Sequence, residues 1–299
     1  MKRFLLALFL LSGFTVNAQT DTVKYWTRGG VFGLNFTQAS FTNWAAGGVN
    51  SISAQGLLNL FANYKKGTST WDNTLEMSYG MLQQGRTALI RKTDDKFDFT
   101  SKYGRRAFND KWYYSALFNF KTQFVDGFNY ISDTSKVKIS DFLAPAYGLL
   151  ALGMDYKPNT KFTLFISPFT GRVTIVNDSA LSSIGAFGVK PGETLRNEFG
   201  GYLRAQYRAD IIQNVNLMAR LELFSNYLDR PQNIDVNAEV LLTMKVNKYI
   251  SASVNMQAIY DNDINIKGDF NNDGVIAPTE SGPRLQFRQV LGIGFSAKF

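Results

Sequence analysis

Apolar and polar residues alternate along most of the chain after residue 18. The segment 233–246 shows the pattern most clearly, because Ile234, Val236 and every second residue up to Val246 are apolar, and most residues between them are polar. Side chains two positions apart lie on the same face of a β-strand, so the pattern predicts a strand with one apolar and one polar face. It resumes over 249–261, and the short break between the two segments predicts a hairpin.

The same pattern predicts twelve strands in all. Most of these segments are far longer than the strands of about 5 or 6 residues typical of soluble proteins, and a strand of about 9 to 11 residues spans a bilayer. A water-soluble sandwich of two sheets is the alternative, but it would not need strands of this length. The predicted strands lie at 28–38, 50–65, 69–83, 93–107, 111–125, 143–157, 161–175, 194–210, 214–228, 233–246, 249–261 and 284–299.

The connections between these strands alternate in length. Outer-membrane barrels have short periplasmic turns and longer outer loops, and an even number of strands leaves both termini in the periplasm. The long connections fall at 39–49, 84–92, 126–142, 176–194 and 261–283, the short ones at 66–68, 108–110, 158–160, 211–213 and 247–248, and one of medium length at 229–232. We therefore predict an all-β fold: a transmembrane, antiparallel, up-and-down β-barrel of about 12 strands in the outer membrane of a bacterium, with both termini periplasmic.

The two ends of the chain fit this location. Lys2 and Arg3 precede an apolar run, and small residues follow up to Ala18, which is typical of a secretory signal peptide over 1–18. The remainder, 19–299, is expected to be a single barrel domain. The last strand ends on Phe299 and resembles the C-terminal strand that the barrel assembly machinery recognises, so this machinery is an expected partner. Aromatic residues near strand ends, such as Trp71 and Tyr103, predict an interfacial girdle in contact with outer-membrane lipid.

Composition limits the chemistry. The formal charge is +8, or +6 without Lys2 and Arg3, and an exported chain with this modest excess is not expected to bind nucleic acid. The chain has no cysteine, which excludes disulfides and a lipoprotein anchor, and no histidine. The outer-membrane phospholipase, omptin-type protease, palmitoyl transferase and lipid A deacylase all rely on histidine. We therefore predict that the chain is not an enzyme, and no catalytic residue is assigned.

Acidic residues that share a strand face were considered as general acids or bases. Glu76 with Asp72, and Asp94 with Asp98, stand four positions apart. Such alternating acids are more often solvated or paired with cations, here Lys96 and Lys102. They are not counted as an active site.

The polar face of each strand is expected to line the lumen, and twelve strands leave an interior between the filled core of small barrels and the wide channel of large ones. Two interpretations stay open: an anion-biased pore that uses Arg204, Arg208, Arg220 and Arg288, or a salt-bridged lumen that holds the barrel in shape. The predicted lumen-lining residues are Arg204, Arg208, Arg220, Glu222, Glu239, Lys245, Arg284 and Arg288.

The stretch DFNNDGVIAPTE, 269–280, has the residue spacing of a calcium-binding loop. Pro278 and the flanking strands argue against the usual helices, so the hypothesis is a weak calcium site in an outer loop. The alternative is an ordinary turn rich in Asn, Asp and Gly. The expected ligands are Asp269, Asn271, Asp273, Val275 through its carbonyl, and Glu280.

Several segments resemble one known family. They are LNFTQASFTNWAAGGVNSIS (34–53), WDNTLEMSYGMLQQG (71–85), KYGRRAF (102–108), GGYLRAQYRADI (200–211) and LGIGFSAKF (291–299). Over essentially the whole mature chain, the sequence is similar to the uncharacterised family of outer-membrane barrels called domain of unknown function three-zero-seven-eight. The resemblance implies an outer-membrane barrel and implies no activity.

These observations predict a narrow channel or a binder for small solutes. The alternative is a non-conducting barrel that acts as a scaffold or surface-binding component of an envelope protein complex.

Overall fold

The computed structural model describes residues 25–40, 49–85, 89–130, 135–247, 249–267 and 281–298. Twelve antiparallel strands form one closed barrel in which β1 pairs with both β2 and β16, so the predicted fold is confirmed. The predicted signal peptide, 1–18, lies outside the described residues. The barrel strands are β1 (Trp26–Ala39), β2 (Ser51–Lys66), β3 (Ser69–Gln84), β4 (Arg91–Arg106), β5 (Trp112–Thr122), β8 (Ala146–Tyr156), β9 (Phe162–Ile175), β10 (Leu195–Ile212), β11 (Val215–Asn226), β12 (Ile234–Lys245), β13 (Ile250–Tyr260) and β16 (Gln286–Lys298).

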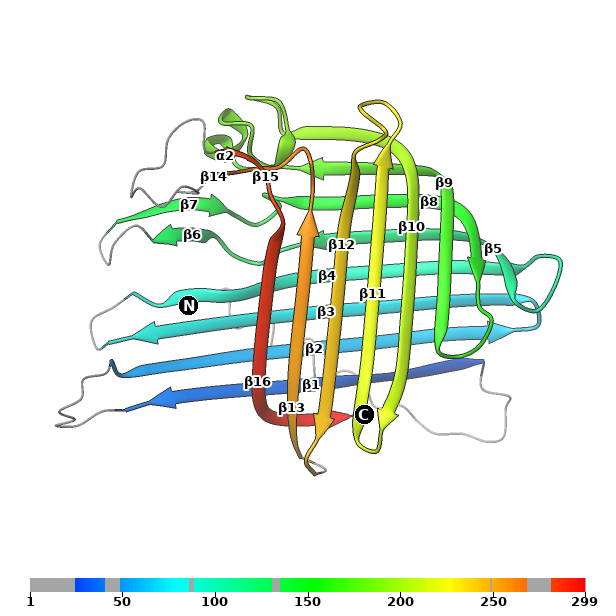
Figure 1. Ribbon diagram of the computed structural model, residues 1–299, viewed down its shortest axis with the longest axis horizontal. Helices are drawn as coiled ribbons and strands as arrows, with labels where there is room; N and C mark the ends of the chain where they lie inside the picture. Colours follow the sequence, from blue (N-terminus) through cyan, green and yellow to red (C-terminus); the bar gives the residue numbers. More distant parts are fainter. Residues whose placement is uncertain are drawn as a thin grey trace.

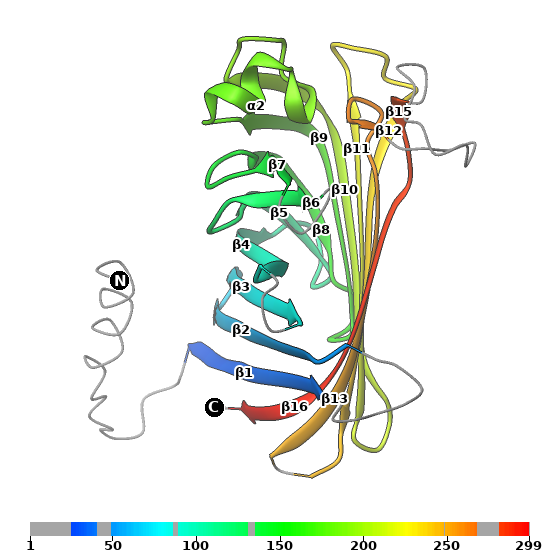
Figure 2. The same cartoon turned by 90° about the vertical axis from the view of Figure 1, so that its left-hand side faces the viewer.

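The two walls of the barrel are visible in Figure 1, where β10 to β13 run nearly vertically across the horizontal strands β1 to β5. Figure 2, turned by a quarter, shows the same strands curving around an interior space. The walls cross because every strand of a barrel is tilted relative to the barrel axis, so opposite walls tilt in opposite directions in projection.

The outer surface is apolar and the interior is charged, the reverse of a water-soluble protein. Leu150, Phe169 and Leu291 are 58%, 61% and 68% exposed, whereas Asp98, Glu198 and Arg220 are 2%, 5% and 6% exposed. This inversion follows from the period-two pattern, because it separates the apolar and polar residues of each strand onto the two sides of the wall. No helix in the described ranges is long and apolar enough to cross a membrane.

The barrel has a short-turn end and a long-loop end. Tight turns join β2 to β3, β4 to β5, β8 to β9, β10 to β11 and β12 to β13 at the short-turn end. The first residue of β1 also lies there, because Trp26 pairs with Tyr64 close to the β2–β3 turn. The last residue of β16, Lys298, pairs with Val31 nearby.

Small ordered elements occupy the long-loop end, and the sequence pattern did not predict these elements. They are the hairpin β6 (Gly127–Tyr130) and β7 (Lys136–Ser140), the helix α2 (Ser179–Ser183), the 3-10 turn η2 (Ala186–Gly188), and the pair β14 (Asn265–Lys267) and β15 (Ser281–Pro283). Leu181 of α2 packs with Ala144, Val176 and Val189 in a small apolar cluster. These contacts hold the helical loop against the barrel rim (Figure 2).

A bulge interrupts β9 at Pro168. Proline has no backbone N–H to donate to a neighbouring strand, and the pairing of β9 changes register there with both β8 and β10. The hydroxyl of Ser167 donates to the carbonyl of Leu152 across the strand boundary at 2.8 Å. This side-chain bond stabilises the irregular part of the wall, where regular backbone pairing is lost.

Candidate functional site in the barrel lumen

A layer of charged side chains crosses the lumen at mid-height, and we call it the middle layer. It contains four cations and four carboxylates, which come from strands of both walls. Its members are Glu76, Lys96, Asp98 and Lys121 from β3, β4 and β5, and Arg204, Arg220, Glu222 and Glu239 from β10, β11 and β12.

Two sets of ion pairs in this layer join opposite walls. Arg220 of β11 contacts Glu76 of β3 at 3.2 Å and also pairs with Glu239 of the neighbouring β12. Lys96 of β4 lies 2.7 Å from Glu76 and 3.6 Å from Glu239. In the ring of twelve strands, β3 and β11 lie six places apart, as do β4 and β12. These contacts therefore span the full width of the barrel.

The rest of the middle layer closes the space beside these bridges. Lys121 contacts Glu222 at 2.7 Å, and Arg204 reaches the same carboxylate at 3.6 Å. Asn119 donates to Asp98 at 2.7 Å and to the hydroxyl of Thr100 at 2.9 Å. Removing charges from water is costly, so buried ions persist only when paired and hydrogen-bonded. The middle layer meets this condition because its four cations and four carboxylates are paired with one another.

Amide side chains extend the network toward β13 and β16. Asn237 donates to Glu222 at 3.0 Å, and Asn255 donates to Glu239 at 2.9 Å. Arg288 of β16 donates to Asn255 at 3.3 Å and also pairs with Asp94 of β4. Strands on both sides of the barrel seam are thus connected through the lumen as well as through the wall.

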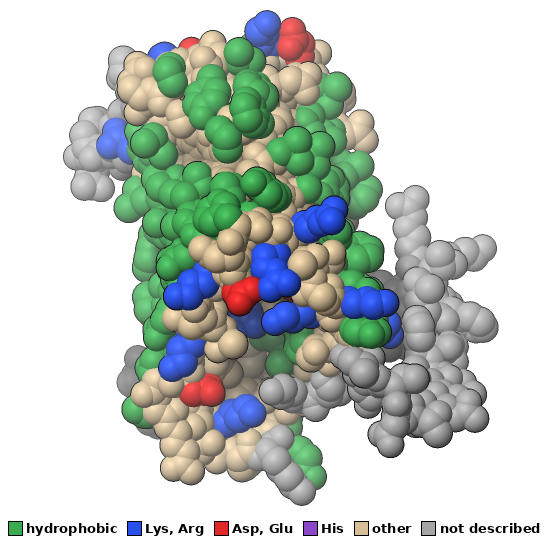
Figure 3. All heavy atoms as spheres, turned by 90° about the vertical axis from the view of Figure 1, so that its right-hand side faces the viewer, with side chains coloured by type: hydrophobic (Ala, Val, Ile, Leu, Met, Phe, Trp, Pro, Cys, Tyr) green, Lys and Arg blue, Asp and Glu red, His purple; other side chains and the backbone are tan. Residues whose placement is uncertain are grey.

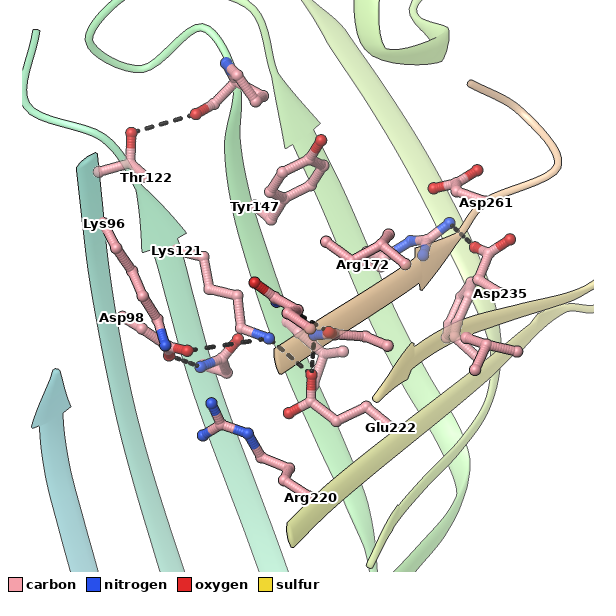
Figure 4. A pocket seen from close by; sticks show the side chains of 18 of the residues that line it. Lys96, Asp98, Lys121, Thr122, Tyr147, Arg172, Arg220, Glu222, Asp235 and Asp261 are labelled. Carbon is pink, nitrogen blue, oxygen red and sulfur yellow. Dashed lines mark hydrogen bonds and ion pairs between the residues drawn. The ribbon is translucent and has the colours of Figure 1, made fainter. Parts of the chain in front are cut away.

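A cavity of about 410 Å³ lies between the middle layer and the long-loop end. Figure 4 shows Lys96, Lys121, Arg220 and Glu222 at its lower side and Tyr147, Arg172, Asp235 and Asp261 nearer the loops. Arg172 is held by Glu198 at 2.6 Å and by Asp235 at 2.7 Å. Small-molecule sites have volumes of about 300 to 1,000 Å³, so this cavity has the size of a small-solute site lined by charges of both signs.

A further group of ion pairs lies on the short-turn side of the middle layer. Lys157 contacts Asp72 at 2.7 Å and Asp155 at 3.3 Å, and Lys102 contacts Asp155 at 2.7 Å. Charged side chains therefore line the interior on both sides of the middle layer.

The lumen-lining residues predicted from the sequence fall in three places. Arg204, Arg220, Glu222 and Glu239 belong to the middle layer, and Arg288 points inward to Asp94. Arg208 and Lys245 are exposed at the short-turn end, where the Arg208 guanidinium lies 3.3 Å from the sulfur of Met218. Arg284 is exposed between β15 and β16, outside the barrel strands.

Strands β4, β5 and β9 supply partners that the prediction left out of the site. Lys121 and Arg172 were not among the predicted residues. Asp98 was weighed as a general acid or base and then set aside as an acid that is solvated or paired with a cation. The expected pairing of Glu76 with Lys96 is present, whereas Lys102 pairs with Asp155. Their position on the polar parity of β4, β5 and β9 was the available signal, but only the closed ring shows which residues face each other.

The predicted calcium ligands, Asp269, Asn271, Asp273, Val275 and Glu280, lie outside the described residues, and the calcium site stays a prediction. Among the described residues no group of three or more acidic side chains is arranged to hold a metal ion.

Comparison with known families gives a match over the early strands of the barrel. Residues 36–128 match the family described as protein of unknown function (DUF3078). The resemblance stated from the sequence is therefore confirmed over this segment, which is shorter than the whole mature chain. The DUF3078 segment contributes Glu76, Lys96, Asp98 and Lys121 to the middle layer, and the later strands contribute their partners.

Solved structures similar to this chain are outer-membrane proteins. The translocator domain of the autotransporter NalP from Neisseria meningitidis is 12% identical, with a TM-score of 0.36, and the match covers 100% of this chain and 94% of that one. An outer membrane channel from Pseudomonas putida F1 is 11% identical, with a TM-score of 0.38 and coverage of 94% and 100%. Outer membrane phospholipase A from Escherichia coli, as an active-site mutant, is 10% identical, with a TM-score of 0.37 and coverage of 95% and 94%. Comparison with curated proteins gives no match.

The prediction that the chain is not an enzyme has to be corrected. It rested on the absence of histidine, and the similar solved barrels include the phospholipase. The absence of one residue type does not make this chain a non-enzyme.

Proposed function

We propose that this outer-membrane barrel binds a small polar solute in the lumenal cavity and lets it pass only when the middle layer opens. The observation that supports the proposal is the cavity of about 410 Å³, which ends on ion pairs that join opposite walls. Because both signs of charge line this cavity, the preferred solutes are small molecules that carry both a cationic and an anionic group.

The proposal includes an orientation. With the short turns in the periplasm, the long-loop end and its cavity face the outside of the cell, and both termini are periplasmic. The barrel assembly machinery is then the partner that inserts the barrel among outer-membrane lipids.

Conductance across a planar lipid bilayer tests the closed middle layer. We expect the wild-type barrel to conduct potassium chloride weakly. The double variant Glu76→Ala, Glu239→Ala removes the carboxylates that join the walls and leaves Arg220 and Lys96 as unpaired cations. This variant is expected to conduct more and to favour anions, read from the reversal potential in a salt gradient.

Glu193→Ala is the matched control, because Glu193 lies in a loop and pairs only at 3.9 Å with the highly exposed Lys190. It is expected to conduct as the wild type does. A double variant that is folded and conducts as weakly as the wild type would contradict the gated passage.

A non-conducting scaffold is the second candidate function, and the closure of the lumen by the middle layer favours it. Purification in mild detergent distinguishes the two. A stoichiometric envelope protein that remains bound would support the scaffold, whereas an isolated barrel whose conductance rises in the double variant supports solute passage.

A further inference from the structure

The outer wall formed by β1 to β4 carries a polar row within an apolar surface. Arg28, Ala62, Asn73 and Ser101 are paired in register across the four strands. They share the outward parity of the exposed residues Trp71 and Tyr103, so they lie on the side that contacts lipid. Polar residues are unusual on this face of a membrane barrel, so the row calls for a physical explanation.

The position of the row along the barrel axis is fixed by its aromatic neighbours. Trp26, Tyr64, Trp71 and Tyr103 form the adjacent register row on the short-turn side. The ring centroid of Trp26 lies 5.2 Å from that of Tyr64 and 5.7 Å from that of Trp71. Such a girdle marks the level of the lipid headgroups, so the polar row lies just below the headgroups, within reach of a phosphate.

The side chains of Asn73 and Ser101 are hydrogen-bonded to each other. The indole N–H of Trp71 donates to the Ser101 hydroxyl at 2.8 Å, and that hydroxyl donates to the amide oxygen of Asn73 at 2.8 Å. The amide nitrogen of Asn73 then donates to the carbonyl of Ala62 at 3.0 Å. This chain of hydrogen bonds needs no ligand.

Arg28 is different. Its guanidinium lies 5.3 Å from the centre of the Trp26 ring, and within the described residues it forms no ion pair. A cation on the lipid face is stabilised when it reaches toward the interface and meets an anion there. Lys66 and Arg105, both exposed, flank Ser69 in register at the rim above the girdle and add positive charge on the same sector.

A groove of about 600 Å³ begins at Arg28 and Asn73 and runs over the same four strands. Leu60, Leu75 and Phe99 line it, and the small side chain of Ala62 leaves it open. Figure 3, which looks onto the side of Figure 1 where β2 ends, shows that Lys and Arg side chains outnumber Asp and Glu on this end of the molecule. A cationic mouth above an apolar groove matches the phosphate and the acyl chain of a lipid.

We propose that this groove binds one anionic phospholipid of the leaflet at the short-turn end. The lipid phosphate pairs with Arg28. Lys66 and Arg105 raise the positive potential around it. One acyl chain lies along Leu60, Leu75 and Phe99. The site does not depend on whether the lumen conducts.

Quenching of tryptophan fluorescence by brominated lipids tests this site, because Trp26 and Trp71 stand beside the groove. The protein is reconstituted in phosphatidylcholine vesicles that contain brominated phosphatidylglycerol or, in parallel, brominated phosphatidylcholine. A cation near the membrane surface contributes about a fivefold preference for anionic lipid. We expect a preference of that size in the wild type, its loss in Arg28→Gln and its recovery in Arg28→Lys.

Lys161→Gln is the control, because Lys161 is exposed in the short turn between β8 and β9, away from the groove. It should keep the full preference. If Arg28→Gln does not fold, Ala62→Phe fills the groove while keeping the cation, and it should lower the preference. Equal quenching by both lipids in the wild type, or a preference that survives in folded Arg28→Gln or Ala62→Phe, would overturn the proposal.

Discussion

Arg220 holds two carboxylates from different walls at the centre of the lumen. It contacts Glu76 at 3.2 Å, pairs with Glu239, and is only 6% exposed. The sequence placed Arg220 in the lumen, because the alternation along β11 is regular. It did not pair Arg220 with Glu76, because 144 residues separate them and only ring closure brings them together.

Replacing Arg220 by alanine is expected to destabilise the barrel. The change leaves Glu76 and Glu239 to share Lys96, which lies 2.7 Å from Glu76 and 3.6 Å from Glu239. Breaking a buried ion pair from one side costs about 3 to 5 kcal/mol. The measurement is the urea midpoint of unfolding in detergent micelles, read from the gel mobility of the folded barrel. Adding Glu239→Gln to Arg220→Ala should restore part of the loss, because it removes one of the two carboxylates that then share Lys96.

Arg230→Ala is the control for this series, because Arg230 and its nearer partner Asp229 are both more than half exposed, and its second partner Asp263 lies 3.6 Å away. Exposed pairs contribute little to stability. A midpoint for Arg220→Ala that equals that of Arg230→Ala would show that the middle layer does not stabilise the fold.

At the scale of elements, one lysine joins two loops at the long-loop end. Lys138 of β7 contacts Asp141 at 2.7 Å and Asp178 at 2.9 Å. Asp178 is the N-cap of α2 and accepts from the backbone N–H of Leu181 at 2.9 Å. One cation therefore ties the β6–β7 hairpin to the helical loop. Sequence patterning missed these elements because they are too short to show a period.

The lysine contact predicts the pH range in which the two loops stay attached. The hydrogen bond from Lys138 holds the pKa of Asp141 and of Asp178 below the usual 3.8, and their carboxylates raise the pKa of Lys138 above the usual 10.5. Because the pKa values of Asp141 and Asp178 are lowered, these carboxylates stabilise the folded state above pH 3.8. This stabilisation is lost as the pH falls through their pKa values in the folded protein. Because the pKa of Lys138 is raised, the lysine stabilises the folded state below pH 10.5. This stabilisation is lost as the pH rises through the pKa of Lys138 in the folded protein.

We expect limited proteolysis of the β6–β7 and α2 loops to be slow near neutral pH and to accelerate in acid below about pH 3.8, with an acid-stable protease as the probe. Lys138→Met should accelerate cleavage at neutral pH as well. Lys190→Met, at an exposed pair in the same loop region, is the control and should not. Cleavage of Lys138→Met at the wild-type rate would contradict the attachment.

At the scale of the whole molecule, the outward side chains determine where the barrel resides. Leu150 lies in the middle of the wall and is 58% exposed, while Ile184 at the end of α2 is 72% exposed. Only Leu150 would contact lipid chains if the barrel spans a membrane. If the barrel were surrounded by water alone, Leu150 and Ile184 would tolerate a charged side chain equally well.

Leu150→Arg is therefore expected to lower barrel stability by about 2 to 4 kcal/mol, the cost of an arginine at the membrane midplane. Ile184→Arg should have little effect. Urea unfolding of the protein folded into lipid vesicles measures both. Equal midpoints for the two variants would be inconsistent with a membrane-spanning wall.

The sequence by itself determined the barrel: the number of strands, their limits to within a few residues, and, in the regular middle of the strands, which side chains face the two sides of the wall. It did so because a strand repeats every two residues, so neighbouring positions alone decide the face of each side chain. Tertiary structure alone decided which charges meet, where the cavity lies and which polar residues form a row on the outer wall. Those depend on strand register and on closure of the ring, which bring together residues such as Glu76 and Arg220 that no local pattern relates.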